Sequence, residues 1–229
     1  MQFSIIIPTL NEAEIIDSCL TTLQPLRGQC QLIVVDGGSS DATLELAAKL
    51  ADVVITSGQG RAKQMNAGAM LAQAELLIFL HADTTLPDNA LQLIQSQISP
   101  TQPWGRFDIR LIGCHPMLAI IAAMMNLRSQ LTGIVTGDQT FFMTKTAFIQ
   151  VGGYPDLALM EDISISAALN RLSRPLCLKA KVSTSARRWQ KFGIGKTILL
   201  MWSLRLRFFF KQNTAYLAEL YNQGRFWSL

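Results

Sequence analysis

The stretch QLIVVDGGSSD at residues 31–41 decides the fold class of this chain. Its apolar start reads as a buried parallel strand, and the polar, glycine-rich residues 36–41 end that strand. Helical spacing follows at once, over residues 42–50. The same strand–helix unit recurs on both sides, with strands predicted at 3–8, 52–56 and 75–80 and helices at 11–23, 61–74 and 87–97. Four such units predict a parallel, doubly wound α/β sheet.

The pattern changes after Pro103. Alternating apolar residues predict a strand at 104–112, and an apolar helix is expected at 115–131. The remaining predicted elements are strands at 136–144 and 176–182, and helices at 146–151, 160–172 and from 195 to about 220. No repeat or low-complexity linker separates the halves, so we expect them to pack together.

Composition and charge exclude several classes of protein. The chain has 229 residues, of which 49% are hydrophobic and 16% charged, and this excludes a disordered, collagen-like or coiled-coil chain. The net charge of +4 is unevenly spread: residues 1–170 carry −7, whereas residues 171–211 carry eleven Lys and Arg and no acid. The four cysteines are scattered, and the start of the chain reads as a strand and not as a signal peptide. No apolar run approaches the roughly 20 residues of a membrane span. We therefore expect a cytoplasmic protein with reduced thiols.

Polar clusters follow three of the predicted strands, at residues 9–12, 36–41 and 81–83. In doubly wound sheets ligands bind at the carboxyl ends of the strands, so these clusters predict one shared site. The sequence lacks a P-loop, a G-x-G-x-x-G after the first strand, a G-x-S-x-G and a Cys/His set with zinc spacing. The remaining carboxylates and arginines suit a divalent cation and a diphosphate.

Five sequence blocks, in this order, resemble the motifs of family-2 inverting glycosyltransferases. The blocks are IIIPTLNE at 5–12, VVDGGSSDAT at 34–43, GRAKQMNAG at 60–68, LHAD at 80–83, and GGY at 152–154 followed by ED at 161–162. They extend over about residues 1–190. The resemblance implies a GT-A type α/β/α sandwich with a mostly parallel open sheet, a nucleotide-diphosphate sugar as donor, and transfer to an acceptor hydroxyl with inversion.

The resemblance also implies a donor site. Its expected residues are Pro8, Thr9, Leu10, Glu12, Asp36, Arg61, His81 and Asp83. Asp36 is expected to contact the nucleobase, Glu12 the ribose and Arg61 the diphosphate. Simpler roles remain open for each: Asp36 as a turn residue bonded to its own backbone, Glu12 as a first-turn helix acid and Arg61 as a solvated charge.

Asp83 is the expected metal ligand, at the position of the family's D-x-D motif. Mg²⁺ or Mn²⁺ bridging the diphosphate would neutralise charge on the departing nucleotide. His81 stands where the family usually has an aspartate. Imidazole suits Mn²⁺ better than Mg²⁺, and His81 could instead bond the ribose or have no ligand role.

Asp162 is the expected general base, because inverting transfer needs one carboxylate to take the acceptor's proton. Glu161 precedes it, and adjacent residues on a helix point about 100° apart, so only one of the two can face the site. Further acceptor or diphosphate contacts are expected at Asp138, Gln139, Glu161, Arg187, Arg188 and Trp189. The alternatives are helix-end acids for Glu161 and Asp162, and surface charge with a core tryptophan for the Arg-Arg-Trp element.

These expectations divide the chain into a glycosyltransferase domain at 1–192 and a basic amphipathic helical extension at 193–229. The domain has a nucleotide-binding half, 1–100, and an acceptor half, 101–192. Lys196, Ser203, Arg207 and Lys211 share one face of the predicted extension helix, and Arg205 interrupts its apolar side. Such a helix suits an anionic membrane surface on the inner face, and hence a lipid or lipid-linked acceptor. Packing on its own domain or in a homodimer is the alternative, and no nucleic-acid motif is present.

Three other functions are alternatives to a glycosyltransferase. A sugar-1-phosphate nucleotidyltransferase should have a glycine-rich loop after the first strand, and residues 8–12, PTLNE, do not provide one. A non-catalytic nucleotide-sugar-binding protein and a membrane-surface adaptor remain as alternatives to the enzyme.

Overall fold

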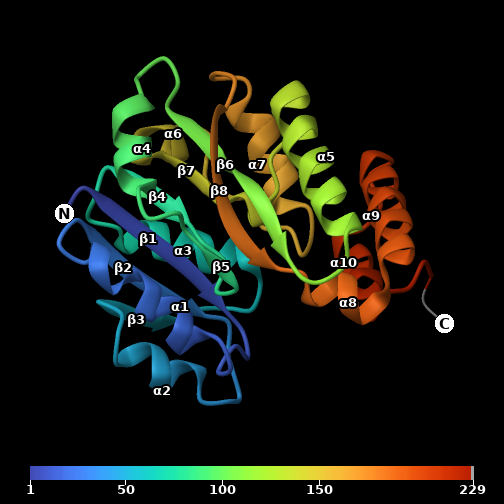
Figure 1. The fold of residues 1–229 in the computed structure, drawn as a ribbon, viewed down its shortest axis with the longest axis horizontal. Coiled ribbons are helices and arrows are strands. Elements are labelled where there is room, and N and C mark those ends of the chain that lie inside the picture. Colours follow the sequence, from blue (N-terminus) through green and yellow to red (C-terminus); the bar gives the residue numbers. More distant parts are fainter. Residues whose placement is uncertain (228–229) are drawn as a thin grey trace.

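An eight-stranded sheet of order β3-β2-β1-β4-β7-β6-β8-β5 runs through the protein (Figure 1). The computed structural model describes residues 1–227. The strands are β1 (Phe3–Thr9), β2 (Cys30–Asp36), β3 (Val53–Thr56), β4 (Leu76–Phe79), β5 (Thr84–Thr85), β6 (Trp104–Ile112), β7 (Phe141–Thr144) and β8 (Leu176–Ser185). The α-helices are α1 (Ile16–Leu23), α2 (Thr43–Ala48), α3 (Arg61–Leu71), α4 (Ala90–Gln97), α5 (Met117–Thr132), α6 (Lys145–Gln150), α7 (Glu161–Leu169), α8 (Arg187–Phe192), α9 (Ile194–Phe209) and α10 (Thr214–Gln223). Short 3₁₀ helices lie at Gln24–Leu26 (η1) and Gly137–Gln139 (η2).

The first four long strands confirm the parallel unit predicted for residues 1–100. β1 pairs in parallel with β2 and with β4, and β2 pairs in parallel with β3. Thr9 stands opposite Asp36 at the last position of the β1–β2 ladder. The carboxyl ends of β1, β2 and β4 therefore share one edge, as a ligand site of this fold requires.

The second half makes the sheet mixed. β7 lies between β4 and β6 and is antiparallel to both, and β5 is antiparallel to β8, whereas β6 and β8 are parallel. The strand predicted at 136–144 is wrong over its first part. Thr136 and Gln139 form a capping box at the start of η2, so that only Phe141–Thr144 is extended. This turn brings Asp138 out of the sheet.

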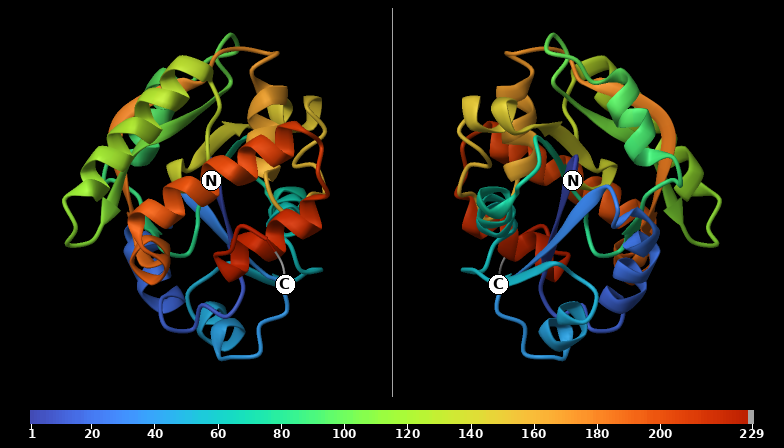
Figure 2. Two further views of the ribbon diagram at one scale, coloured as in Figure 1. Left: turned by 90° about the vertical axis from the view of Figure 1, so that its right-hand side faces the viewer. Right: turned by 90° about the vertical axis from the view of Figure 1, so that its left-hand side faces the viewer.

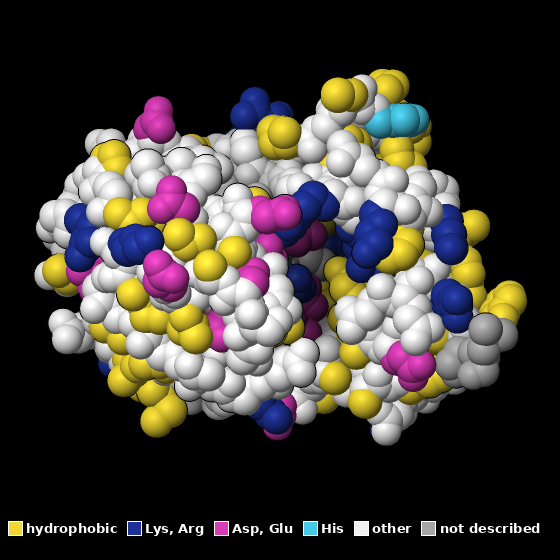
Figure 3. Space-filling view, turned by 90° about the horizontal axis from the view of Figure 1, so that it is seen from below, with side chains coloured by type: hydrophobic (Ala, Val, Ile, Leu, Met, Phe, Trp, Pro, Cys, Tyr) yellow, Lys and Arg dark blue, Asp and Glu magenta, His cyan; other side chains and the backbone are white. Residues whose placement is uncertain are grey.

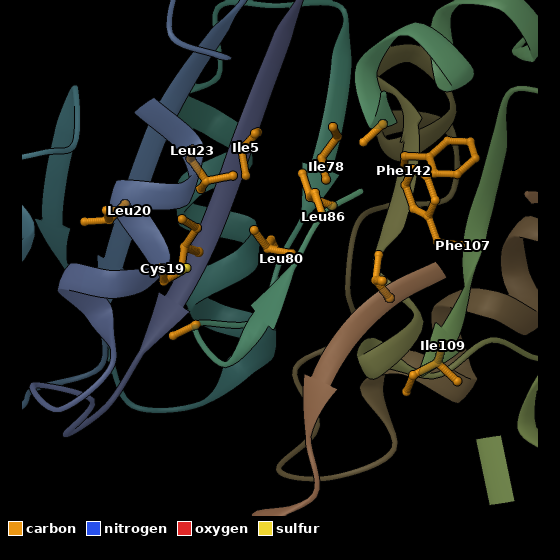
Figure 4. Close-up of a cluster of buried hydrophobic side chains, with 14 of the residues drawn as sticks. Ile5, Cys19, Leu20, Leu23, Ile78, Leu80, Leu86, Phe107, Ile109 and Phe142 are labelled. Atoms are coloured by element: carbon orange, nitrogen blue, oxygen red, sulfur yellow. The ribbon is translucent and has the colours of Figure 1, made fainter. Parts of the chain in front are cut away.

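Alternate residues of the buried strands supply two apolar layers. Ile5 and Ile7 face the layer that contains α1, α4 and α5, and Ile6 faces the layer that contains α3, α6 and α7. In Figure 4, Cys19, Leu20 and Leu23 of α1 lie beside Ile5, and Phe107 lies beside Phe142. Helices thus cover both faces, as Figure 2 shows, and the predicted α/β/α sandwich with C-terminal helices is confirmed.

The predicted single helix from 195 to about 220 is two helices. α9 ends at Phe209, Lys211 has a φ of 58°, and α10 starts at Thr214. Leu200 and Leu204 of α9 pack with Leu217 and Leu220 of α10 and with Met160. One face of the extension therefore packs on its own domain; residues 228 and 229 lie outside the described part. Among residues 1–227, no helix combines the length and apolar character needed to cross a membrane.

Candidate active site

Asp36 organises the turn that follows β2. Its carboxylate is fully buried and accepts hydrogen bonds from the backbone N–H groups of Gly38 (2.8 Å) and Ser39 (2.7 Å) and from Thr9 Oγ1 (3.2 Å). This is the turn role that the sequence left open, and the nucleobase contact expected for Asp36 stays a prediction. Pro8 and Thr9 are also buried, whereas Leu10 is exposed beside the turn.

The loops after β1 and β2 are tied together by side chains that sequence analysis did not single out. Asn11 has a φ of 54°, and its Oδ1 accepts a hydrogen bond from Ser40 N at 2.9 Å. The backbone N–H of Glu12 donates to Thr43 Oγ1 at 2.9 Å, and the N–H of Ala13 donates to Asp41. These hydrogen bonds hold the two loops together and fix the backbone that carries the Glu12 side chain.

Arg187 joins the two halves of the protein. It is the first residue of α8, and its guanidinium lies 3.2 Å from Glu12 Oε2 and 3.3 Å from Asp83 Oδ2. Desolvation opposes its charge, but the two carboxylates outweigh it and raise the pKa of Arg187. The sequence singled out all three residues, and the structure adds that one arginine bridges both acids.

Asp83 fits a metal site completed by substrate. It lies just beyond the end of β4, half-buried, and its Oδ1 accepts long hydrogen bonds of 3.4 Å from Thr84 and Thr184. Within residues 1–227, no group of three or more His, Cys, Asp or Glu side chains is arranged to hold a metal ion. Mg²⁺ and Mn²⁺ often bind through one carboxylate, substrate phosphates and water, so a single aspartate is compatible with such a site.

His81 faces a different partner. Its Nδ1 lies 3.4 Å from Asp138 Oδ1, and a Cβ on Gly137 would come within 2.7 Å of its Nε2. The ring is thus packed against η2, and its role toward a metal stays a prediction. Desolvation alone would raise the pKa of Asp138, but the hydrogen bond and charge of His81, with Arg61 and Arg128, lower it.

Asp162 is held toward the same turn. Its Oδ2 accepts a hydrogen bond from Gly137 N at 3.1 Å, and its Oδ1 accepts one from Ile163 N at 2.7 Å. Glu161 is only 6% exposed, and burial, followed by the charge of Asp162, raises its pKa. The two acids at the start of α7 therefore differ: Asp162 is partly open and Glu161 is enclosed.

Arg61 balances this acidic group. It is the first residue of α3, and its side chain is exposed. Desolvation lowers its pKa, but Tyr221 and the carboxylates of Glu161, Asp138 and Asp162 raise it overall. Arg61 therefore lies in the field of three carboxylates, although none of those described lies within 4.0 Å of it.

Three residues predicted as acceptor or diphosphate contacts make contacts within the fold. Gln139 is fully buried and donates to Ser129 Oγ at 2.9 Å, because the capping box turns it inward. Arg188 stacks over the ring of Tyr221, 3.4 Å from its centroid, and holds α10 against α8. Trp189 packs against the apolar core. These contacts lie within the fold, and Arg188 also interacts electrostatically with Arg61 and Asp138 of the site.

The remaining side chains form a group in which direct contacts join two sets, while Arg61 interacts with its acids through charge alone. Contacts lead from Glu12 through Arg187 to Asp83, and from His81, two residues before Asp83, through the η2 turn to Asp162. Figure 3 shows a hollow between the first half and the C-terminal helices, with acidic and basic side chains gathered around it. We call this group the polar cluster: Glu12, Arg61, His81, Asp83, Asp138, Asp162 and Arg187.

Comparison with known families shows what this arrangement resembles. Residues 4–108, slightly less than half of the chain, match the family described as Glycosyl transferase family 2. The resemblance to family 2 is confirmed over this segment. The match ends within β6, so most of the acceptor half lies beyond it.

Curated relatives match a shorter segment. A PGL/p-HBAD biosynthesis glycosyltransferase of Mycobacterium tuberculosis is 41% identical over 92 residues, and the same values hold for the protein of that name from Mycobacterium bovis. The aligned segment covers 37% of this chain and 36% of each relative. The chain therefore spans about a third of the length of these relatives.

Solved structures extend the likeness to the whole fold. A mannosyltransferase from Pyrobaculum calidifontis, in complex with GDP-Man and Mn²⁺, superimposes with a TM-score of 0.60 at 20% identity, covering 80% of this chain and 56% of that one. TarS of S. aureus, in complex with UDP-GlcNAc, gives 0.63 at 18% identity, covering 81% and 58%. Glucosyl-3-phosphoglycerate synthase from Mycobacterium tuberculosis, with Mn²⁺, UDP and glucosyl-3-phosphoglycerate, gives 0.60 at 15% identity, covering 80% and 70%. At these identities the likeness establishes the fold.

Proposed function

We propose that this protein is an inverting glycosyltransferase that moves a sugar from a nucleotide-diphosphate donor to an acceptor hydroxyl. One observation carries the proposal. The η2 turn links the carboxyl end of β4, through His81 and Asp138, to the open carboxylate of Asp162. A donor-side strand end and a candidate base are thus held by one rigid turn, as a transfer between two bound substrates requires.

The donor side is formed by Glu12, Asp83 and Arg187. A divalent cation, Mg²⁺ or Mn²⁺, held by Asp83 would neutralise charge on the leaving diphosphate. Arg187 is half-exposed, and its hydrogen bonds to the two carboxylates are all longer than 3 Å, so it can exchange a carboxylate for diphosphate oxygens. Glu12, in the loop after β1, provides a carboxylate for the ribose hydroxyls.

The acceptor side is formed by Asp162 and its supports. Asp162 takes the proton from the acceptor hydroxyl as that oxygen attacks the anomeric carbon, and the bond from this carbon to the diphosphate breaks. A single displacement of this kind inverts the anomeric centre. Gly137 N and Ile163 N each donate to one oxygen of Asp162, and together they fix the direction of the carboxylate.

A thermal-shift panel tests the donor proposal. We expect one of UDP, GDP, CDP and dTDP to raise the melting temperature of the full chain, and to do so with Mg²⁺ or Mn²⁺ far more than with EDTA, because ligands that bind only the folded state stabilise it by mass action. A shift by all four nucleotides alike would point to unspecific anion binding. No shift with any of them contradicts the proposed function. Binding without release of nucleotide when acceptors are supplied favours the non-catalytic alternative.

We also propose that the protein contacts the inner face of a membrane from the cytoplasm, through its C-terminal part. Leu199, Trp202, Leu206 and Phe209 form an exposed apolar stripe on α9, at the spacing of one helix face. Residues 171–211 contain no acid and eleven basic residues, which complements an anionic surface.

A vesicle experiment tests the membrane proposal. We expect wild-type protein to sediment with vesicles containing phosphatidylglycerol, and Phe209→Ser to reduce the bound fraction severalfold, since a buried phenylalanine stabilises by about 2 kcal/mol. Met70→Ser is the matched control, because Met70 is 83% exposed on α3, away from the extension. Equal sedimentation of all three proteins contradicts the proposal. Binding that persists when the protein shows no nucleotide response favours the adaptor alternative.

A further inference from the structure

Two arginines outside the polar cluster lie in the electrostatic field of Asp162, one in the acceptor half and one in the C-terminal extension. Arg128 lies on α5 and Arg205 on α9, helices that neighbour each other at the right of Figure 1. Both are half-buried, and Asp162 acts on both of them electrostatically. Neither arginine was singled out from the sequence as a site residue.

Both guanidiniums are poorly satisfied. Arg128 makes one long hydrogen bond, 3.5 Å from Nη2 to Thr136 Oγ1, and its buried Nε has no partner. Within the part of the chain that the structure describes, neither arginine has a carboxylate within 4.0 Å, and Arg205 makes no hydrogen bond. Two like charges that are partly removed from water and lack ion pairs are costly to maintain.

The nearby carboxylates do not compensate this pair. Desolvation, and then the charge of Arg205, lower the pKa of Arg128 to about 10, although Asp162 and Asp138 oppose the shift. Desolvation also lowers the pKa of Arg205, against the single opposing effect of Asp162. Arg61 behaves in the opposite way, because the acids around it raise its pKa. The carboxylates of Glu161, Asp138 and Asp162 thus stabilise the charge of Arg61. They do not offset the desolvation of Arg128 and Arg205, whose positive charges stay uncompensated.

We propose that Arg128 and Arg205 form a binding site for a phosphate or similar oxyanion group carried by the acceptor substrate. Guanidinium groups bind phosphate oxygens through paired, charge-assisted hydrogen bonds. An anion between α5 and α9 would satisfy the free donors and remove the repulsion between the two cations. It would also place the acceptor beside Asp162. This assignment of the acceptor class rests on the proposed function, whereas the anion site itself does not.

Inorganic phosphate is the probe for this site. We expect phosphate to raise the melting temperature of the full chain, and the apparent affinity to fall at least tenfold in Arg205→Gln and in Arg128→Gln. In phosphate-free buffer, Arg205→Gln should be as stable as wild type or more stable, because it relieves the repulsion. Arg171→Gln is the matched control: Arg171 is exposed and basic, and should keep the full phosphate response.

The nucleotide panel, run on the same variants, separates this site from the donor site. Loss of the phosphate response with the nucleotide response retained supports an anion site distinct from the donor diphosphate. An unchanged phosphate response in both variants overturns the proposal, and so does a loss of both responses together. If wild type responds to phosphate through these arginines but to no nucleotide, the proposed function fails and the anion site stands.

Vesicles distinguish a lipid phosphate from a soluble one. Phosphatidic acid in phosphatidylcholine presents a phosphomonoester at the membrane surface. Binding that falls in Arg205→Gln but not in Lys49→Gln, which changes an exposed basic residue outside the basic segment 171–211, supports a lipid headgroup in the site. A response to soluble phosphate with no effect of Arg205→Gln on vesicle binding supports a soluble phosphorylated acceptor.

Discussion

Asp162→Asn should lower the rate of sugar transfer by about 10²–10⁴-fold, the usual contribution of general base catalysis. An amide does not take up the acceptor's proton. Its single oxygen can still accept the hydrogen bond from Gly137 N but not also the one from Ile163 N, so the turn keeps its link to the side chain. The measurement is nucleotide release from the donor identified by the thermal-shift panel. Nucleotide binding should be unchanged, because the substitution acts on the acceptor side.

Two further variants, Asp156→Asn and Glu161→Gln, decide whether the loss of activity is specific to Asp162. Asp156→Asn changes an exposed acid of the preceding loop whose carboxylate lies 3.7 Å from Lys63, and it should keep full activity. Near-full transfer by a folded Asp162→Asn protein contradicts the assignment of the base.

Glu161→Gln has a different expected signature. Burial raises the pKa of Glu161 in the folded protein, so the charged form costs stability at neutral pH. The neutral glutamine should therefore raise the melting temperature at pH 7. This gain should shrink as the pH falls through the folded pKa, and disappear below the carboxyl's ordinary value, where the acid is protonated in both states. A large loss of activity in Glu161→Gln with full activity in Asp162→Asn would move the base to Glu161.

The first half of the fold was predictable because its signals are local. Apolar runs at the strands and helical spacing between them predict four parallel strands. The structure contains them, and β1 and β2 pair in parallel along their whole length. The second half depends on pairings distant in sequence. An apolar run such as FFMT in β7 reads the same in a parallel or antiparallel strand, and nothing local indicates that it enters between β4 and β6.

The site shows the same limit. Glu12, Asp83 and Asp162 were identifiable because they follow strands or open a helix in recognisable blocks. Arg187 bonds Glu12 across 175 positions of the sequence, and that pairing has no local signal. Arg128 and Arg205 were harder still, because an arginine within an apolar helix looks like an interruption of its pattern. Only the three-dimensional structure shows that the two charges act on each other and on one carboxylate.

The second large effect is expected at Asp83. Asp83→Asn should abolish the metal-dependent part of the nucleotide response and lower transfer by about 10²-fold or more, since an amide oxygen is a weak ligand for Mg²⁺ and offers no negative charge. The ligand-free protein should hardly change in stability. The ion pair of Asp83 with Arg187 is partly exposed, and such pairs contribute about 1 kcal/mol or less. The measurement is the melting temperature with and without nucleotide, in Mg²⁺, Mn²⁺ and EDTA.

Asp88→Asn is the control for this change, because Asp88 is an exposed acid in the same region of the chain and should behave as wild type. Arg187→Gln adds a second test of the same geometry. In the ligand-free protein Arg187 supplies the positive charge beside Asp83, so its removal should strengthen binding of the metal alone while weakening binding of the nucleotide. If Asp83→Asn kept the metal-dependent nucleotide shift, the metal would be held elsewhere. The bridge from Glu12 through Arg187 to Asp83 would then be a structural tie between the halves and not the donor side of an active site.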